Sequence, residues 1–156
     1  MVSGRMVRTT RTWRTPLTHS VLLLGVSNGL SSAAGRKPAT RAARQALFTE
    51  AVEILANEAS RPITLEEVAR RIATSPRQLQ RVFTENAGMG FRSYLRRLRL
   101  SNAADLLLST ELSVGEIANA VGYGDGSQFA KSFKRAYGVS PSWFRAMAAD
   151  VAGRTS

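Results

Sequence analysis

The pattern of a helix, a tight turn and a second helix occurs twice in this chain. The first copy begins at Thr64 and ends at Gly88, and the second begins at Ser113 and ends at Gly138. The offset between the copies is 49 residues at the start and 50 at the end, so the second turn has one extra residue. This internal repeat predicts two copies of a helix-turn-helix unit and constrains the fold more than any other feature of the sequence.

Signals for helix ends support this interpretation. The Ser/Thr-x-x-Glu spacing of a capping box, in which side chain and backbone at a helix start bond each other reciprocally, occurs at Thr64–Glu67 and at Ser113–Glu116. The second helix of the first copy begins at Ser75-Pro76, where a proline in the first helical position costs no hydrogen bond. Ser140-Pro141 begins a last short helix in the same way. The repeat therefore has defined helix boundaries.

Apolar residues at helical spacing predict an all-α fold, and no window alternates apolar and polar residues as a half-buried strand does. We expect two helix-turn-helix subdomains, at about 65–86 and about 114–137, each a homeodomain-like three-helix unit. One long linker helix over about 91–109 joins them, with a length of about 28 Å. The helical domain is expected to begin at Ala42. The expected divisions are a basic, disordered tail over 1–41, the domain over 42–150 and a C-terminal tail over 151–156.

Charge is distributed unevenly along the chain. The 156 residues carry 22 Lys plus Arg against 11 Asp plus Glu, a formal net charge of +11. Residues 1–41 contain seven of the basic side chains and no acidic one, so the rest of the chain is only moderately basic. A positive surplus attracts polyanions of any kind, including nucleic acid and anionic membrane surfaces. Charge alone does not choose between these partners.

The tail leaves several interpretations open. An apolar run at 21–26 is far too short to span a bilayer, although basic residues before it and small residues after it imitate a weak secretory signal. A disordered arm, the remnant of a larger upstream domain, and a true start at Met6 instead of Met1 are the alternatives. We expect no membrane association of the domain.

Residue usage excludes several kinds of chemistry. The chain has no cysteine and a single histidine, His19, which lies in the tail. Disulfides, thiolate metal sites and cysteine nucleophiles are therefore excluded, and histidine catalysis and zinc binding are not expected. The sequence predicts no catalytic residue, no cofactor and no metal, and so no enzyme.

The second helix of the first copy has one apolar and one polar side. Leu79 and Phe83 are expected to pack inward, whereas Arg77, Gln80, Arg81 and Thr84 form an outward stripe at i, i+3, i+4 and i+7. Arginine can bond guanine and glutamine can bond adenine through paired hydrogen bonds. An ordinary solvated helix face is the alternative, but the capping box, turn and glycine stop favour a recognition helix.

The second copy offers different side chains at the corresponding positions. Ser127, Ala130, Lys131 and Lys134 replace the polar stripe, with Gln128 and Arg135 beside them. Lysine is a point charge suited to phosphate, so this copy is expected to supply affinity and register more than sequence choice. The predicted base-contacting residues are Arg77, Gln80, Arg81, Ser127, Gln128 and Lys131. The predicted phosphate-contacting residues are Ser75, Thr84, Arg96, Lys134 and Arg135.

Two further groups have more than one interpretation. Arg92, Arg96 and Arg99 follow one face of the linker helix, where they contact phosphate or form a solvated or internally paired face. The aromatic residues Tyr94, Trp143 and Phe144 imitate a base-stacking platform, but their helical spacing favours core packing.

Several stretches resemble the DNA-binding domain of the AraC/XylS transcriptional regulators, over roughly Ala42 to Met147. They are Ile63–Ala69, Ser75–Phe83, Tyr94–Leu100, Ile117–Tyr123, Ser127–Phe129, Phe133-Lys134 and Gly138–Pro141. The resemblance implies two recognition helices in successive major grooves on one side of DNA. It places base contacts at Arg77, Gln80 and Arg81, and around Gly126, Ser127 and Lys131. Gly126 stands where members often have a polar side chain, and Ala73 replaces a usual glycine.

The resemblance implies a cytoplasmic, nucleoid-associated transcriptional regulator whose partners are double-stranded DNA and RNA polymerase. The tail is too short to form a small-molecule ligand domain. The chain is therefore similar to short members of the family, or to the C-terminal piece of a longer ligand-responsive regulator. A general architectural DNA-binding protein is the alternative of a different class. A secreted or membrane-surface cationic protein has support only from residues 5–34.

Overall fold

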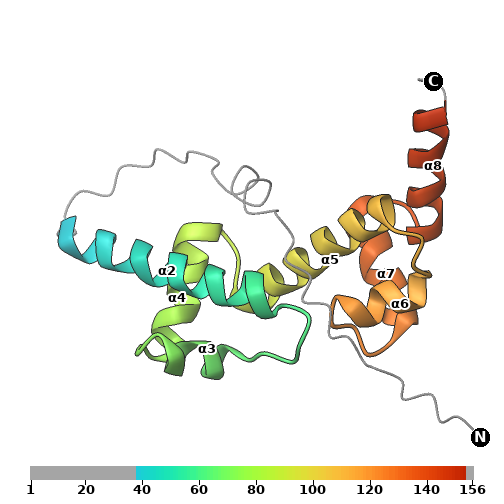
Figure 1. Ribbon diagram of the computed structural model, residues 1–156. Coiled ribbons are helices and arrows are strands. Elements are labelled where there is room, and N and C mark those ends of the chain that lie inside the picture. The colour runs from blue at the N-terminus through green and yellow to red at the C-terminus, as the bar shows by residue number, and fades with distance from the viewer. Residues whose placement is uncertain (1–37, 154–156) are drawn as a thin grey trace, which may run out of the picture. The chain divides into compact units, whose positions relative to one another are not determined.

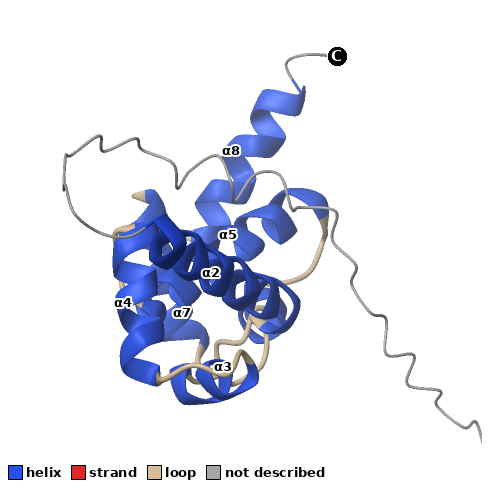
Figure 2. Cartoon of the chain, turned by 90° about the vertical axis from the view of Figure 1, so that its left-hand side faces the viewer, coloured by secondary structure: helices blue, strands red, loops and turns tan. Residues whose placement is uncertain are grey.

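A computed structural model describes residues 38–153, and the predictions made for residues 1–37 lie outside this part of the chain. Within it the structure contains only helices, which confirms the all-α fold class (Figures 1 and 2). The helices are α2 (Pro38–Glu58), α3 (Leu65–Arg71), α4 (Pro76–Ala87), α5 (Phe91–Ser109), α6 (Val114–Ala120), α7 (Gly126–Tyr137) and α8 (Pro141–Gly153). No helix in the described residues is long and apolar enough to cross a membrane.

The long helix α5 joins two groups of three helices (Figure 1). Helices α2, α3 and α4 pack on one another and on the start of α5, whereas α6, α7 and α8 pack around its second half. Within each group, a short helix and a longer helix joined by a tight turn form the helix-turn-helix predicted from the repeat. The linker helix covers Phe91–Ser109, as expected.

Each group has an aromatic residue at the centre of its core. Phe83 and Phe133 are both completely buried, which confirms the predicted inward faces of α4 and α7. The Phe83 ring lies edge-on to Phe91 and Phe48, with ring centroids 5.4 and 5.3 Å away. The Phe133 ring lies edge-on to Phe144 at 5.4 Å. Such pairs add about 0.5–1.5 kcal/mol beyond the burial of area, so both cores are held by similar interactions.

Both hydrogen bonds of the second capping box form as predicted, whereas only one of the two forms in the first. Ser113 Oγ accepts the Glu116 backbone N–H, and the Glu116 carboxylate accepts the Ser113 N–H at 2.8 Å. Thr64 Oγ1 accepts the Glu67 N–H at 3.1 Å, yet no reciprocal bond is made. The Glu67 carboxylate instead accepts from Arg61, in the loop after α2, and from Arg71 of α3. Charge-assisted bonds to arginine are stronger than a bond to a neutral backbone donor, which accounts for the difference.

Two other expectations change in the structure. Helix α2 begins at Pro38, four residues before the expected start at Ala42, with proline in the first position. Trp143 is 51% exposed, so the prediction that it packs in the core is wrong. Phe144 and Tyr94 do contact the cores. Because successive helical residues point about 100° apart, the inward side of α8 that takes Phe144 turns Trp143 toward solvent.

Candidate nucleic-acid interface

Helix α4 separates its apolar and polar residues cleanly. Leu79, Val82 and Phe83 are completely buried against the rest of the first group. The predicted polar stripe of Arg77, Gln80, Arg81 and Thr84 is exposed along the opposite side of the helix. Ser75 precedes the helix, and its hydroxyl oxygen accepts the Gln78 N–H at 3.1 Å as the N-cap. The buried face therefore holds the helix while the polar face is available to a partner.

Arg81 forms an ion pair along the surface of α4. Its Nε donates to Glu85 Oε1 at 2.8 Å, and the Arg81 side chain remains 56% exposed. Glu85 also accepts from Arg44 of α2 at 2.7 Å. Hydrogen bonds from Arg81 and Arg44 lower the pKa of the Glu85 carboxyl, so it stays ionised at neutral pH. This exposed pair holds Arg81 weakly, and a base or phosphate that binds the guanidinium competes with Glu85.

Gln80 and Thr84 bond to nearby backbone. The Gln80 side-chain oxygen accepts the Phe91 N–H at 3.4 Å, at the start of α5, where Gly90 offers no side chain to cap the helix. The Thr84 hydroxyl donates to the carbonyl of Gln80 at 3.0 Å. Gln80 thus links the recognition helix to α5 and uses one of its hydrogen-bonding groups there. Its amide nitrogen still has donors for a base.

Helix α7 presents a more basic polar face. Phe129 and Phe133 are fully buried, whereas Ser127, Gln128, Lys131, Lys134 and Arg135 are all exposed. The start of this helix is capped by Asp125, which lies between two glycines. The Asp125 carboxylate accepts the backbone N–H groups of Ser127 and Gln128 at 2.7 and 3.3 Å. Asp125 is therefore a cap whose Asx-type signal was present in the sequence but was missed.

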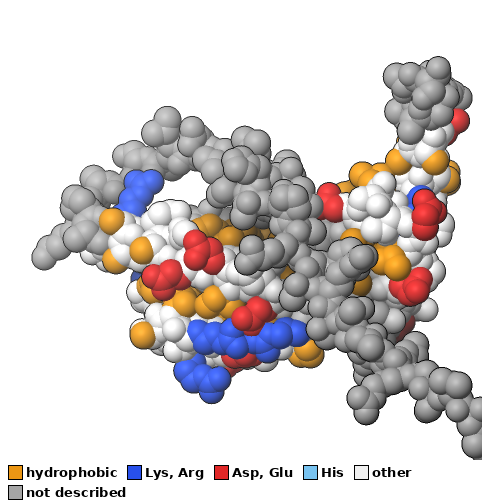
Figure 3. All heavy atoms as spheres, in the orientation of Figure 1, with side chains coloured by type: hydrophobic (Ala, Val, Ile, Leu, Met, Phe, Trp, Pro, Cys, Tyr) orange, Lys and Arg blue, Asp and Glu red, His pale blue; other side chains and the backbone are white. Residues whose placement is uncertain are grey.

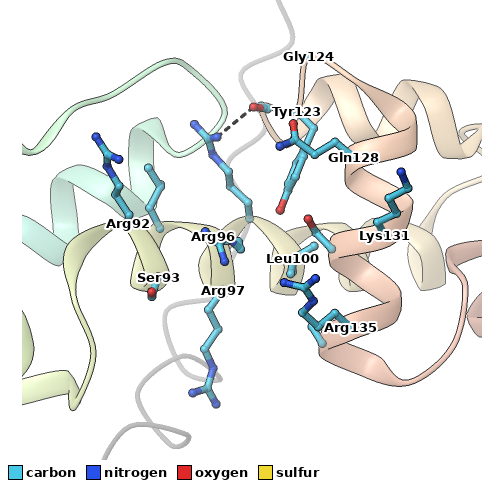
Figure 4. A pocket seen from close by; sticks show the side chains of 15 residues that line it. Arg92, Ser93, Arg96, Arg97, Leu100, Tyr123, Gly124, Gln128, Lys131 and Arg135 are labelled. Atoms are coloured by element: carbon cyan, nitrogen blue, oxygen red, sulfur yellow. Dashed lines mark hydrogen bonds between the residues drawn. The ribbon is translucent and has the colours of Figure 1, made fainter.

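A cleft of about 760 Å³ lies between α5 and α7, and we call it the α5–α7 cleft. Its walls carry basic side chains from both helices (Figure 4), and no acidic residue lies among its lining residues in the described part of the chain. Figure 4 shows Gln128, Lys131 and Arg135 along α7, and Arg92, Arg96 and Arg97 along α5. The Tyr123 hydroxyl is buried beside this cleft and has no hydrogen-bond partner within the described residues. The basic residues that line it are Arg92, Arg96, Arg97, Arg99, Lys131 and Arg135.

A second, smaller cleft of about 420 Å³ connects the α5–α7 cleft to the first recognition helix. It is lined by Gln80 of α4, by residues of α3 and by Arg92, Ser93 and Leu95 of α5. The last three residues also line the α5–α7 cleft. A hollowed surface therefore runs from Gln80 across α5 to Lys131, and it includes side chains from both repeats.

The charges over α3 are arranged differently. In Figure 3, Lys/Arg and Asp/Glu side chains lie together over this helix. Arg71 there pairs with Glu58 at 2.9 Å and with Glu67 at 2.7 Å. Arg61 also pairs with both carboxylates. Internal pairing neutralises much of the basic charge here, so this paired surface is a weaker candidate for polyanion binding than the α5–α7 cleft.

The three arginines grouped on α5 have different environments. Arg92 and Arg96 are exposed and line the cleft. Arg99 is partly buried and donates to three backbone carbonyls, which corresponds to the internally paired alternative. Partial burial lowers the pKa of the Arg99 guanidinium from its ordinary value. Sequence periodicity places all three on one face and cannot separate them, because the carbonyls that Arg99 contacts belong to distant segments.

Two similar three-helix groups that share a long helix, each with a polar outward face on the longer helix of its helix-turn-helix, define a double helix-turn-helix domain. The family model described as "Helix-turn-helix domain" matches residues 68–147. A transcriptional regulator with an AraC-type DNA-binding domain from Chromobacterium violaceum has a similar structure. It is 30% identical and has a TM-score of 0.66, with 69% of this chain and 96% of that chain covered. The chain belongs to the AraC-type helix-turn-helix family.

Two other relatives extend the comparison. The HTH-type transcriptional activator RhaR of Klebsiella pneumoniae is 37% identical over 102 residues, which are 65% of this chain and 36% of that protein. The DNA-binding domain of AdpA, a global transcriptional factor solved in complex with a target DNA, is 27% identical with a TM-score of 0.61. The match covers 64% of this chain and 90% of that one. The chain spans between 26% and 36% of the length of the first curated relatives that it matches.

Proposed function

We propose that this domain is a sequence-specific double-stranded DNA-binding module of a transcriptional regulator. In this proposal α4 and α7 enter successive major grooves, and the α5–α7 cleft receives the sugar-phosphate backbone between them. The observation that carries the proposal is the hollowed surface that runs from Gln80 to Lys131 through residues shared by both clefts. The relation to a family that includes a domain solved on its target DNA supports it.

The two recognition helices are proposed to contribute unequally. Arg77, Gln80 and Arg81 on α4 have donors suited to base edges, and each bidentate contact discriminates by about 1–3 kcal/mol. On α7, Ser127, Gln128 and Lys131 are proposed to contact bases, with a smaller share of the sequence choice. Ser75, Thr84, Arg96, Lys134 and Arg135 are proposed to contact phosphates, which set affinity and register without reading sequence.

Selection of bound duplexes from a random DNA pool tests the proposal. We expect the full chain to enrich one composite site with two half-sites about one helical turn apart. Arg81→Ala should relax the preference at one or two base pairs of one half-site. Lys131→Ala should weaken binding on all duplexes and reduce the salt slope by about one unit. Arg41→Ala, which removes one exposed positive charge from α2, is the charge-matched control and should leave the preferred site unchanged.

Two outcomes would contradict different parts of the proposal. If no sequence is enriched at any salt concentration, the proposed sequence-specific function is rejected. If Lys131→Ala changes the preferred bases as much as Arg81→Ala does, both helices read sequence and the proposed asymmetry is wrong.

General architectural DNA binding is the second candidate, because the exposed face of α7 presents point charges in place of an arginine–glutamine stripe. An architectural protein binds its best and its average duplex with similar affinity. A specific regulator binds its own site at least about 10³-fold more tightly than other DNA. The ratio of the two affinities at one fixed salt concentration therefore decides between the candidates.

RNA polymerase is proposed as the protein partner, and the cytoplasm, at the nucleoid, as the location. The RhaR relative carries the name of a transcriptional activator, which supports activation as the direction of control. Transcription in vitro from a promoter that contains the selected site tests this. A rise in transcript with polymerase and the full chain supports activation, whereas a fall identifies a repressor.

A further inference from the structure

The Arg99 side chain connects segments from both helix-turn-helix units. Its Nε donates to the carbonyl of Ala59 at 2.7 Å, and its Nη2 donates to the carbonyl of Arg61 at 2.9 Å. Its Nη1 donates to the carbonyl of Gly122 at 3.0 Å, the bond marked by the dashed line in Figure 4. Ala59 and Arg61 follow α2 in the first unit, whereas Gly122 lies in the turn of the second unit. One planar guanidinium therefore holds three carbonyls that come from two separate units.

Gly122 brings the two segments into direct backbone contact. Its φ is +89°, a conformation that favours glycine. A Cβ atom at this position would lie 2.7 Å from the carbonyl oxygen of Ser60 and 3.0 Å from that of Ala59. No side chain fits between the turn and the α2–α3 segment. The two units thus touch at a point beside α5, in addition to their connection through that helix.

We propose that Arg99 and Gly122 form a junction that fixes the separation and orientation of the two recognition helices, and so determines which spacing of DNA half-sites is bound. This inference rests on the proposed DNA-binding function. Arg99 acts as a positioning residue, because its donors are directed to backbone carbonyls.

Two connections between the units restrain their relative motion more than one connection does. A single helix joined to two small units bends and twists, and a small rotation within α5 moves the far unit by several ångströms. A second connection beside the helix restrains that motion. One inserted base pair turns the second half-site by about 36° and moves it by about 3.4 Å along the axis. If the junction resists a displacement of this size, the two recognition helices fit only half-sites with one separation. The protein then prefers DNA with that number of base pairs between the half-sites.

Two variants weaken the junction from opposite sides. Arg99→Lys keeps the charge but cannot reach three carbonyls at once, and Gly122→Ala places a methyl group against the Ser60 carbonyl. Arg41→Lys is the matched control, because Arg41 is exposed on α2 and lines neither cleft. Thermal melts followed by circular dichroism identify the variants that fold. If one variant is unfolded, the other still disrupts the same contact.

Spacing selectivity is the first measurement, with the duplex selected from the random pool. For wild type and Arg41→Lys, insertion of one base pair between the half-sites should weaken binding strongly. For Arg99→Lys and Gly122→Ala, affinity for the intact composite site should fall at least about tenfold, since charge-assisted bonds are lost. The penalty for the insertion should shrink, while affinity for a duplex with only one half-site should remain that of wild type. An unchanged spacing profile in both folded variants overturns the inference.

A second measurement does not depend on DNA. The chain has no cysteine, so spin labels can be attached to Ala56→Cys on α2 and Ala120→Cys on α6, both of which are exposed positions. The interlabel distance distribution should be narrow in the otherwise unchanged chain and broader with Arg99→Lys. A distribution that stays narrow overturns the junction. A broadened distribution in a chain that enriches no DNA sequence supports the junction and rejects the proposed function, so the two failures are distinguishable.

Discussion

At the scale of single residues, the two turns of the repeat differ at one equivalent position. Gly122 and Ala73 are 49 residues apart and both have positive φ, +89° and +52°. The left-handed conformation suits glycine, whereas it costs an alanine about 1–2 kcal/mol. The first turn therefore carries backbone strain that the second turn avoids. The substitution noted in the sequence is compatible with the fold but is strained.

Ala73→Gly should stabilise the folded chain by about 0.5–1 kcal/mol. Relief of the left-handed alanine exceeds the greater conformational entropy that glycine adds to the unfolded chain. Urea denaturation of the two proteins measures the difference. The reverse change at the equivalent position, Gly122→Ala, should destabilise, since strain and a close carbonyl contact act together. If Ala73→Gly destabilises, the strain assigned to this turn is absent.

The arginine–glutamate cluster between α2 and α3 predicts sensitivity to acid. Bonds from arginine side chains, Arg61 first in both cases, lower the pKa values of Glu58 and Glu67 below the ordinary 4.5. Because the folded pKa is lower than the unfolded one, this contribution is complete above the unfolded value and is lost as pH falls through the folded value.

The melting temperature of the wild type should therefore fall as the pH drops below the ordinary carboxyl pKa of 4.5 and through the lower pKa values of the folded state. Glu67→Gln should show a smaller fall over the same interval, because one of the titrating carboxylates is gone. Melts at low and high salt provide a control, since exposed pairs are screened by salt. An equal loss in both proteins would show that Glu67 makes no contribution to acid sensitivity.

The sequence predicts on which side of a helix a side chain lies, but it does not predict which distant groups that side chain hydrogen-bonds. The outward placement of Arg77, Gln80 and Arg81 follows from helical periodicity alone. The bond between Gln80 and Phe91, and the three bonds of Arg99, join residues that are far apart in sequence. Periodicity places a side chain on a face, but it carries no information about which distant carbonyl or amide that face meets.

At the scale of helices, the two buried phenylalanines allow a direct comparison of the repeats. Phe83→Ala and Phe133→Ala should each destabilise by about 3–5 kcal/mol, as large-to-small core changes do. Both rings are completely buried and make edge-on aromatic contacts. Thermal and urea denaturation measure the loss. Leu108→Ala, at an exposed position on α5, is the control and should change stability little.

Similar losses would mean that the two units share one cooperative transition. If Phe133→Ala leaves a separate early transition while Phe83→Ala lowers the whole curve, the units unfold independently, and the junction at Arg99 does not couple them. A negligible loss in either variant would contradict the core positions assigned to these rings.

Helix boundaries were predictable wherever a local signal was recognised. The starts of α4 and α6, and the glycine stops of α4 and α7, follow from caps that act within a few residues. The start of α7 follows from a local cap as well, since the Asp125 carboxylate accepts the N–H groups of Ser127 and Gln128. The half-formed box at Thr64 does not follow from the capping pattern, because Glu67 is bonded by Arg71 of the same helix and by Arg61 of the preceding loop. Capping residues within a few positions determine where these helices begin and end. Competing arginine side chains determine whether a capping carboxylate bonds the backbone.

At the scale of the whole molecule, the repeat determined the architecture. Two matching units joined by a long helix follow from the sequence pattern, and the resemblance supplied the expected family. The continuous hollowed surface from Gln80 to Lys131 needed the structure, because it depends on how the units are held at α5. The position of Gly122 against the α2–α3 segment is the clearest case, since no local signal relates the two segments.

Residues 38–153 should fold and bind the selected DNA without the preceding segment. The completely buried residues of both cores, including Phe83, Phe91, Phe129 and Phe133, all lie within this range. Residues 1–37 carry six basic and no acidic side chains, so their removal should reduce affinity on all duplexes and lower the salt slope. The preferred sequence should not change, because the proposed base-contacting side chains remain.

Circular dichroism and binding to the selected duplex at two salt concentrations, on the full chain and on 38–153, make the comparison. An unfolded 38–153 would show that the domain boundary is misplaced. A folded 38–153 that binds DNA but prefers a different sequence would mean that residues 1–37 read bases. In that case the two recognition helices would not account for the specificity of the whole protein, and the asymmetry proposed between α4 and α7 would have to be measured again with the first segment present.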